Sequence, residues 1–182
     1  MTAELALKSI RARYPDASAK VGLILGSGLS ELADKVDGSS IPYAELPGFP
    51  QAGVSGHSAE LTIGTLEGKP VAVLGGREHY YEHGRAAAMR VPLETLAALG
   101  VDTLIATNAC GSFRADIPPG DLMLIADHIN FAGLSPLIGE PTDRRFVNVT
   151  EAYDPRLRKS LRAAAEAVDV PLKEGVYAWW PG

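Results

Sequence analysis

Apolar residues follow two different patterns along this 182-residue chain. Near the start, Leu7, Ile10 and Tyr14 stand three and four positions apart, which predicts an amphipathic helix that ends at Pro15. Elsewhere, short continuous apolar runs bounded by turn-forming residues predict strands, several of them buried. These runs cover residues 21–25, 61–66, 71–74, 103–106, 122–125 and 175–180.

Between the strands, the pattern alternates between helices and loops. A short helical segment is expected over 29–36, and polar loops rich in Gly and Pro over 37–56 and 131–150. Two further helices have one apolar face each. The first presents Met89, Leu93 and Leu96, and Pro92 either lies in its first turn or kinks a longer helix. The second begins at Asp154 and Pro155 and presents Leu157, Leu161, Ala164 and Val168. This alternation favours an α/β fold with a central mixed or parallel sheet, in one domain over 1–182.

Composition narrows the function classes. The chain has 17 Lys and Arg against 22 Asp and Glu, a net charge of −5, without a basic run, which argues against a nucleic-acid partner. Its 46% hydrophobic content excludes intrinsic disorder, and the single Cys110 excludes an internal disulfide or a Cys-rich zinc site. No run of about 18 apolar residues and no signal-peptide layout is present. We therefore expect a cytoplasmic protein without a membrane partner.

Gly26-Ser27-Gly28 lies between a predicted strand and a predicted helix. Such a turn directs backbone N–H groups and a serine hydroxyl toward an anion. The third glycine position of a dinucleotide-binding motif holds Glu31 instead, and the lysine of a P-loop is missing. An ordinary turn is the alternative interpretation.

The densest polar cluster spans residues 76–84. In an extended segment Arg77, His79 and Tyr81 project to one side, and the arginine fork matches phosphate. A solvated loop is the alternative. The segment also spells H-x-x-E-H with His79, Glu82 and His83, which allows a zinc hydrolase as a rival hypothesis. That hypothesis needs a helix presenting both histidines, and the flanking glycines argue against one.

A third candidate segment, 107–112, follows a predicted strand, at the end where α/β proteins bind ligands. Its small residues allow close approach of a ligand to the backbone. The alternative is a tight strand exit with Cys110 as a small buried side chain. A serine-hydrolase elbow, G-x-S-x-G, does not occur in the sequence.

Several ordered motifs point to one family. They are Gly26-Ser27-Gly28-Leu29, Gly56-His57-Ser58, residues 76–82, residues 107–111, residues 120–130 and Glu174-Gly175-Val176-Tyr177. Together they resemble the purine nucleoside phosphorylases of the trimeric, low-molecular-mass type, in order from about residue 21 to 178. A neighbouring branch that cleaves methylthioadenosine shares the first motif and Arg-x-His. Residues 81–82 and 127–130 look more like the purine nucleoside branch.

The resemblance implies a single α/β domain with a central mixed sheet flanked by helices. It also implies phosphorolysis of purine nucleosides or deoxynucleosides to the free base and (deoxy)ribose 1-phosphate, in purine salvage. Phosphate is then a co-substrate, and neither a cofactor nor a metal is expected. By analogy, the phosphate ligands are Ser27, His57, Arg77, His79 and the backbone N–H of Ala109.

Three further roles follow from the same resemblance. Tyr81 would pack on the ribose, and Glu82 would orient His79, so that His79, Glu82 and His57 form the catalytic set. Phe146 would enter the ribose pocket of a neighbouring subunit, which implies a homotrimer.

The sequence departs from the family pattern near its end. After Tyr177 the family continues through Gly-Pro-x-Phe-Glu, whereas this chain reads Ala178-Trp179-Trp180-Pro181-Gly182. We therefore expect a C-terminally truncated phosphorylase whose last third, with the base-binding residues, is missing. A non-catalytic phosphate- or nucleoside-binding fragment is the alternative. The choice among purine nucleosides is not encoded in the motifs present.

Overall fold

The computed structural model describes residues 2–26, 28–51 and 59–180. The chain forms two compact units, Met1–Ala109 and Cys110–Gly182, which are described separately. Unit 1 contains α1 (Ala3–Arg13), β1 (Val21–Ile24), η1 (Ser30–Lys35), β2 (Asp37–Pro42), η2 (Tyr43–Glu45), β3 (Glu60–Leu66), β4 (Lys69–Leu74), α2 (Tyr80–His83), α3 (Arg90–Ala98) and β5 (Thr103–Ala106), where η marks a 3₁₀ helix.

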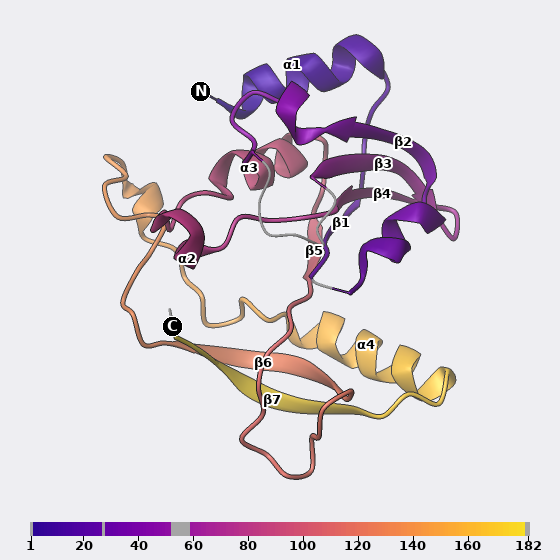
Figure 1. The fold of residues 1–182 in the computed structure, drawn as a ribbon, viewed down its shortest axis with the longest axis vertical. Coiled ribbons are helices and arrows are strands. Elements are labelled where there is room, and N and C mark those ends of the chain that lie inside the picture. Colours follow the sequence, from indigo (N-terminus) through magenta and orange to yellow (C-terminus); the bar gives the residue numbers. More distant parts are fainter. Residues whose placement is uncertain (1, 27, 52–58, 181–182) are drawn as a thin grey trace. The chain divides into compact units, whose positions relative to one another are not determined.

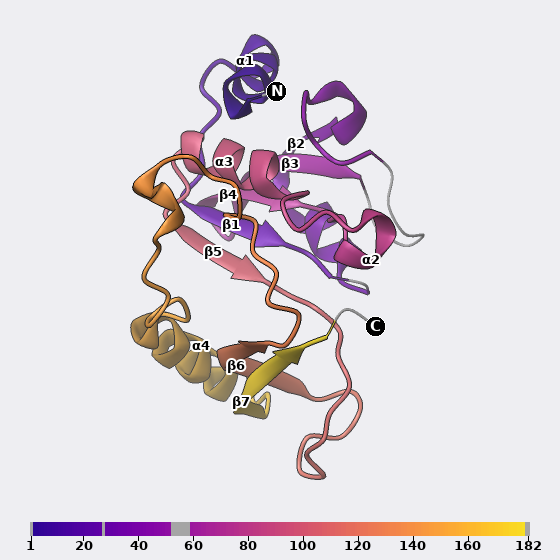
Figure 2. The same cartoon turned by 90° about the vertical axis from the view of Figure 1, so that its left-hand side faces the viewer.

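A mixed five-stranded sheet forms the centre of unit 1. The strands lie in the order β2-β3-β4-β1-β5 (Figures 1 and 2). Strand β1 pairs in parallel with β4 and β5, whereas β2, β3 and β4 pair antiparallel. The expected α/β class with a central mixed sheet is confirmed.

Alternate residues of the central strands face two separate apolar clusters. Ile24 and Leu74 join the residues of α1 and α3 in the larger cluster, which includes Ile10 and Leu96. Their neighbours Leu23, Leu25, Val71 and Val73 lie in a smaller cluster, against which Leu32 and Ala33 of η1 pack. A strand that is covered on both faces is apolar at every position, which explains the continuous apolar runs.

The loop predicted over 37–56 is wrong in its first part. Residues Asp37–Pro42 form the edge strand β2, and η2 follows. Gly38 faces Gly64 of β3, and a Cβ built on Gly38 would lie 2.2 Å from the Ile63 carbonyl oxygen. The glycine that suggested a loop is therefore required by close strand approach.

Two further expectations need correction. Helix α3 has Pro92 in its first turn as predicted, but its buried residues are Pro92, Thr95 and Leu96, and Leu93 is exposed. Strand β5 alternates half-buried and exposed residues instead of being buried, because it is an edge strand.

Unit 2 contains β6 (Leu122–Asn130), η3 (Asp143–Arg145), α4 (Pro155–Ala167) and β7 (Leu172–Trp179). Strands β6 and β7 form a parallel pair with a bulge between Ile125 and Asp127. Both strands were predicted, although β6 is longer than expected and its residues are half-buried or exposed instead of buried. Residues 131–150 form a loop as predicted, apart from η3.

Helix α4 begins as its sequence predicts. The Asp154 carboxylate accepts hydrogen bonds from the backbone N–H groups of Arg156 and Leu157, at 2.7 and 3.1 Å, and Pro155 occupies the first turn. The hydrogen bond from the Arg156 side chain, together with these backbone bonds, lowers the pKa of Asp154 to about 2. Within the described ranges, none of the helices combines the length and apolar character needed to traverse a bilayer.

Candidate functional site

The candidate site lies where three parallel strands end. Gly26 follows β1, Arg77 follows β4, and Asn108 and Ala109 follow β5. Because β1 pairs in parallel with both neighbours, these three segments emerge at the same edge of the sheet. Ligands of open α/β sheets bind at this edge.

Arg77 connects two of these segments. Its half-buried side chain extends from the end of β4 past β1, where Nη1 donates to the Thr107 carbonyl at 2.5 Å and lies 3.4 Å from the Leu25 carbonyl. The guanidinium is thus held beside the C-terminal ends of all three strands, here called the strand exits. A planar group with five donors in a fixed fork is well suited to phosphate.

His79 is held by Glu82. The Glu82 carboxylate accepts the His79 backbone N–H at 2.6 Å and lies 2.9 Å from Nδ1 of the ring. These hydrogen bonds, the backbone one first, keep the pKa of the Glu82 carboxyl below its ordinary value. An ionised carboxylate accepts the proton on Nδ1, so this contact fixes both the tautomer and the orientation of the ring. This geometry is what the role expected of Glu82, to orient His79, requires.

Tyr81 stacks on His79. The two rings are 4.9 Å apart at their centroids and 10° from parallel, and Tyr81 is 65% exposed. One face of the tyrosine is therefore used to support the histidine. The remaining exposed surface is available for contact with a sugar.

This segment is held in place by Tyr43, which the sequence analysis did not single out, and by Glu78, to which it assigned no role. The buried Tyr43 hydroxyl donates to the Gly76 carbonyl at 2.8 Å. Glu78 is buried, and its carboxylate accepts hydrogen bonds from both Nε and Nη2 of Arg85, at 3.1 and 2.5 Å. The period-two alternation that assigned Arg77 and His79 to one side also assigns Glu78 to the other.

Ser27 and His57 lie outside the described residues. Ala109 lies two residues after Thr107, so its backbone is close to the strand exits, whereas Cys110 is exposed and not the buried side chain that was the alternative.

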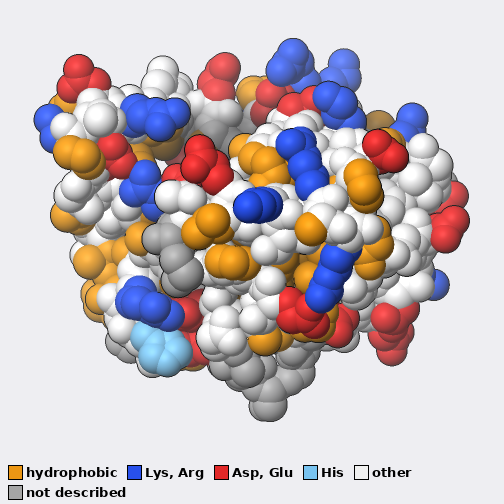
Figure 3. All heavy atoms as spheres, turned by 90° about the horizontal axis from the view of Figure 1, so that it is seen from above, with side chains coloured by type: hydrophobic (Ala, Val, Ile, Leu, Met, Phe, Trp, Pro, Cys, Tyr) orange, Lys and Arg blue, Asp and Glu red, His pale blue; other side chains and the backbone are white. Residues whose placement is uncertain are grey.

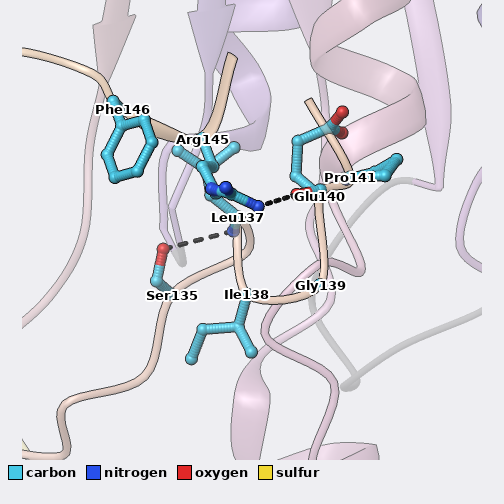
Figure 4. Close-up of a pocket in the computed structure, with 8 residues that line it drawn as sticks. All are labelled: Ser135, Leu137, Ile138, Gly139, Glu140, Pro141, Arg145 and Phe146. Carbon is cyan, nitrogen blue, oxygen red and sulfur yellow. Dashed lines mark hydrogen bonds between the residues drawn. The ribbon is translucent and has the colours of Figure 1, made fainter. Parts of the chain in front are cut away.

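Phe146 belongs to unit 2 and is 74% exposed. The Arg145 guanidinium lies 5.0 Å above its ring. Both residues line a depression of about 390 Å³ in the loop before α4, which also includes Ser135, Leu137, Ile138, Gly139, Glu140 and Pro141 (Figure 4). The aromatic ring is thus presented on the surface of its own unit.

The zinc hypothesis lacks the geometry it requires. Helix α2 has four residues, and His79 precedes it in an extended conformation, with φ −96° and ψ 150°. His83 directs Nδ1 toward Glu78, at 3.2 Å. The two histidines therefore do not share a helix face, and within the described ranges no group of three metal-ligating side chains occurs.

The surface charge is mixed on the face drawn in Figure 3. Among the side chains coloured there, lysine and arginine are interspersed with aspartate and glutamate. This face therefore does not carry the single-sign patch that would attract a polyanion.

Comparison with known proteins gives a consistent result. Residues 20–182 match the family model of the phosphorylase superfamily. The chain is 44% identical over 179 residues to purine nucleoside phosphorylase 1 of Geobacillus stearothermophilus, and 41% identical to that of Bacillus subtilis. Each alignment covers 96% of this chain, which spans 65% of the length of these relatives.

Solved structures agree with the sequence comparison. Isoform 2 of purine nucleoside phosphorylase from Schistosoma mansoni, in complex with cytosine and ribose-1-phosphate, superposes with a TM-score of 0.90 at 33% identity, covering 100% of this chain and 66% of that one. A second Schistosoma mansoni structure, in complex with acetate, has a TM-score of 0.89 at 35% identity and covers 100% and 72%. The resemblance stated from the motifs is confirmed: the chain belongs to the phosphorylase superfamily, among the purine nucleoside phosphorylases.

Proposed function

We propose that this protein is a purine nucleoside phosphorylase, in which inorganic phosphate displaces a purine from (deoxy)ribose to give the free base and (deoxy)ribose 1-phosphate in purine salvage. The observation that carries the proposal is the position of Arg77, whose guanidinium is held beside the exits of β1 and β5. Similarity to relatives that bear this name supports it.

In this proposal the chain's main chemical task is to hold the phosphate. Arg77 supplies the charged fork, and His79 adds a ring whose orientation Glu82 fixes. The backbone N–H of Ala109, with Ser27 and His57, completes the set of phosphate ligands. A fixed anion is positioned to attack the anomeric carbon, and it stabilises the positive charge that develops on the sugar.

Tyr81 contacts the ribose in this scheme, and Phe146 contacts the ribose of a neighbouring subunit in a homotrimer. The exposure of both rings supports these roles, at 65% and 74%. Phosphate is the co-substrate and a cofactor is not needed. A cytoplasmic location fits the substrates of this reaction.

The test is phosphate-dependent release of hypoxanthine from inosine, with phosphate binding measured in parallel by calorimetry. We expect turnover only with phosphate present, and loss of both turnover and binding in Arg77→Ala. The matched control is Arg11→Ala, an exposed arginine of α1, which should behave as the wild type. Phosphate binding without turnover would instead support a non-catalytic binding module, and unchanged binding in Arg77→Ala would refute both.

A further inference from the structure

Thr107 joins two strand exits through its side chain. Its hydroxyl accepts the Gly26 N–H at 2.8 Å and donates to the Ile24 carbonyl at 3.2 Å. Gly26 and Ile24 belong to the end of β1, whereas Thr107 follows β5. A single hydroxyl therefore acts as donor and acceptor for one stretch of backbone, which ties Gly26 to the neighbouring strand.

The backbone of the same residue holds Arg77. The Thr107 carbonyl accepts Nη1 of Arg77 at 2.5 Å. The bond involves a charged donor, and such bonds are about twice as strong as neutral ones. Thr107 therefore contacts both the arginine that follows β4 and the turn that follows β1.

Close packing makes this arrangement specific. A Cβ built on Gly26 would lie 2.7 Å from the Thr107 carbonyl oxygen and 3.1 Å from the Asn108 Cα. The absent side chain of Gly26 is what allows that carbonyl to lie where Arg77 reaches it. The hydrogen bonds and the packing thus depend on the same two residues.

We propose that Thr107 is a positioning residue of the phosphate site, which sets the backbone at Gly26 and the Arg77 guanidinium at a fixed separation beside one anion. This inference rests on the proposed function, because it assigns a role within the same site. Thr107 itself does not contact the substrate in this scheme; it acts through Gly26 and Arg77.

The decisive pair of variants is Thr107→Val and Thr107→Ser. Valine keeps the branched shape and removes the hydroxyl, which leaves the buried Gly26 N–H without this acceptor, whereas serine keeps the hydroxyl. Thr103→Val is the matched control, since it makes the same change at the opposite end of β5, where the hydroxyl bonds to Asp102 at 3.1 Å.

The measurements are phosphate affinity by calorimetry, and the KM for phosphate and for inosine, each with the other substrate saturating. We expect Thr107→Val to raise the phosphate Kd and KM about tenfold, the equivalent of one hydrogen bond. The inosine KM should change much less. Thr107→Ser and Thr103→Val should remain close to the wild type. A general loss of structure would instead weaken the binding of both substrates together.

Three results would overturn the inference: wild-type phosphate affinity in Thr107→Val, an equal loss for both substrates, or a serine variant as weak as the valine variant. If Thr107→Val does not fold, Gly26→Ala is the second variant. Its methyl displaces the Thr107 carbonyl while the hydroxyl remains, so phosphate binding should again weaken. Wild-type phosphate affinity in this variant would refute the proposal. A wild-type chain that binds no phosphate would refute the proposed function itself, which distinguishes the two failures.

Discussion

Removal of one buried hydroxyl tests how the segment that carries Arg77 is anchored. Tyr43 is 2% exposed, and its hydroxyl donates to the carbonyl of Gly76, which is also buried and directly precedes Arg77. Tyr43→Phe deletes only the donor and leaves that carbonyl without this partner. Loss of a buried partner costs about 1–3 kcal/mol. We therefore expect the free energy of unfolding to fall by about that amount.

The same variant has a characteristic pH dependence. Burial raises the pKa of Tyr43 well above its ordinary value of 10.0. Between that value and the raised one, the unfolded chain loses the phenolic proton and the folded chain keeps it, so stability falls as pH rises above 10. The slope attributable to Tyr43 is at most about 1.4 kcal/mol per pH unit. Tyr43→Phe should lack this part of the alkaline loss.

The assay is urea unfolding of the wild type and Tyr43→Phe at pH 7, 9, 10 and 11. Tyr14→Phe is the control, because it removes the same atom from a half-buried ring beside the same cluster. Stability of Tyr43→Phe within about 0.5 kcal/mol of the wild type at pH 7, the range of neutral surface changes, would refute the reasoning. An unchanged alkaline slope in the variant would refute the pKa argument separately.

Three further changes test other parts of the fold. Glu78→Gln should lower the free energy of unfolding in urea by about 1–2 kcal/mol, because the Glu78 side chain is 3% exposed and loses its charge beside Arg85. The loss is limited because Arg85 is 61% exposed and screened by solvent. Gly38→Ala should prevent folding as judged by circular dichroism, since its Cβ would lie 2.2 Å from a facing carbonyl oxygen; Gly111→Ala, with open space around it, should be neutral. The wild type should lose helicity as pH falls from 4 toward 2, because the Asp154 carboxyl, whose pKa is lowered to about 2, stabilises the fold only while it is ionised. Asp154→Ala should lack this loss.

The central strands were predictable because their environment is uniform. Leu23 and Ile24 face opposite apolar clusters, so both are apolar and the run stands out in the sequence. Strand β2 was not predictable in the same way. It is an edge strand, and its glycine is there because the backbone of β3 comes too close for a side chain. Local composition does not distinguish such a glycine from one in a loop.

The residues of the candidate site also differ in how far the sequence could predict them. Arg77 and His79 could be found because their chemistry is visible in the residue type and their spacing places them on one side. The roles of Thr107 and Tyr43 could not be found in this way, since each side chain bonds to backbone atoms that are distant in sequence. The hydrogen bond between Gly26 and Thr107 joins residues 81 positions apart. Only the pairing of β1 with β5 brings them together.

These contacts also show which part of the chain carries the proposed phosphate ligands. Arg77, His79, Glu82 and Thr107 all belong to unit 1, and every contact described for them lies within that unit. Their positions follow from the register of β1 with β4 and β5, which is set by the apolar clusters of unit 1. The positions of the proposed phosphate ligands therefore depend on the strand exits themselves. Changes that alter the choice of purine without disturbing this register should leave the proposed phosphate ligands in place.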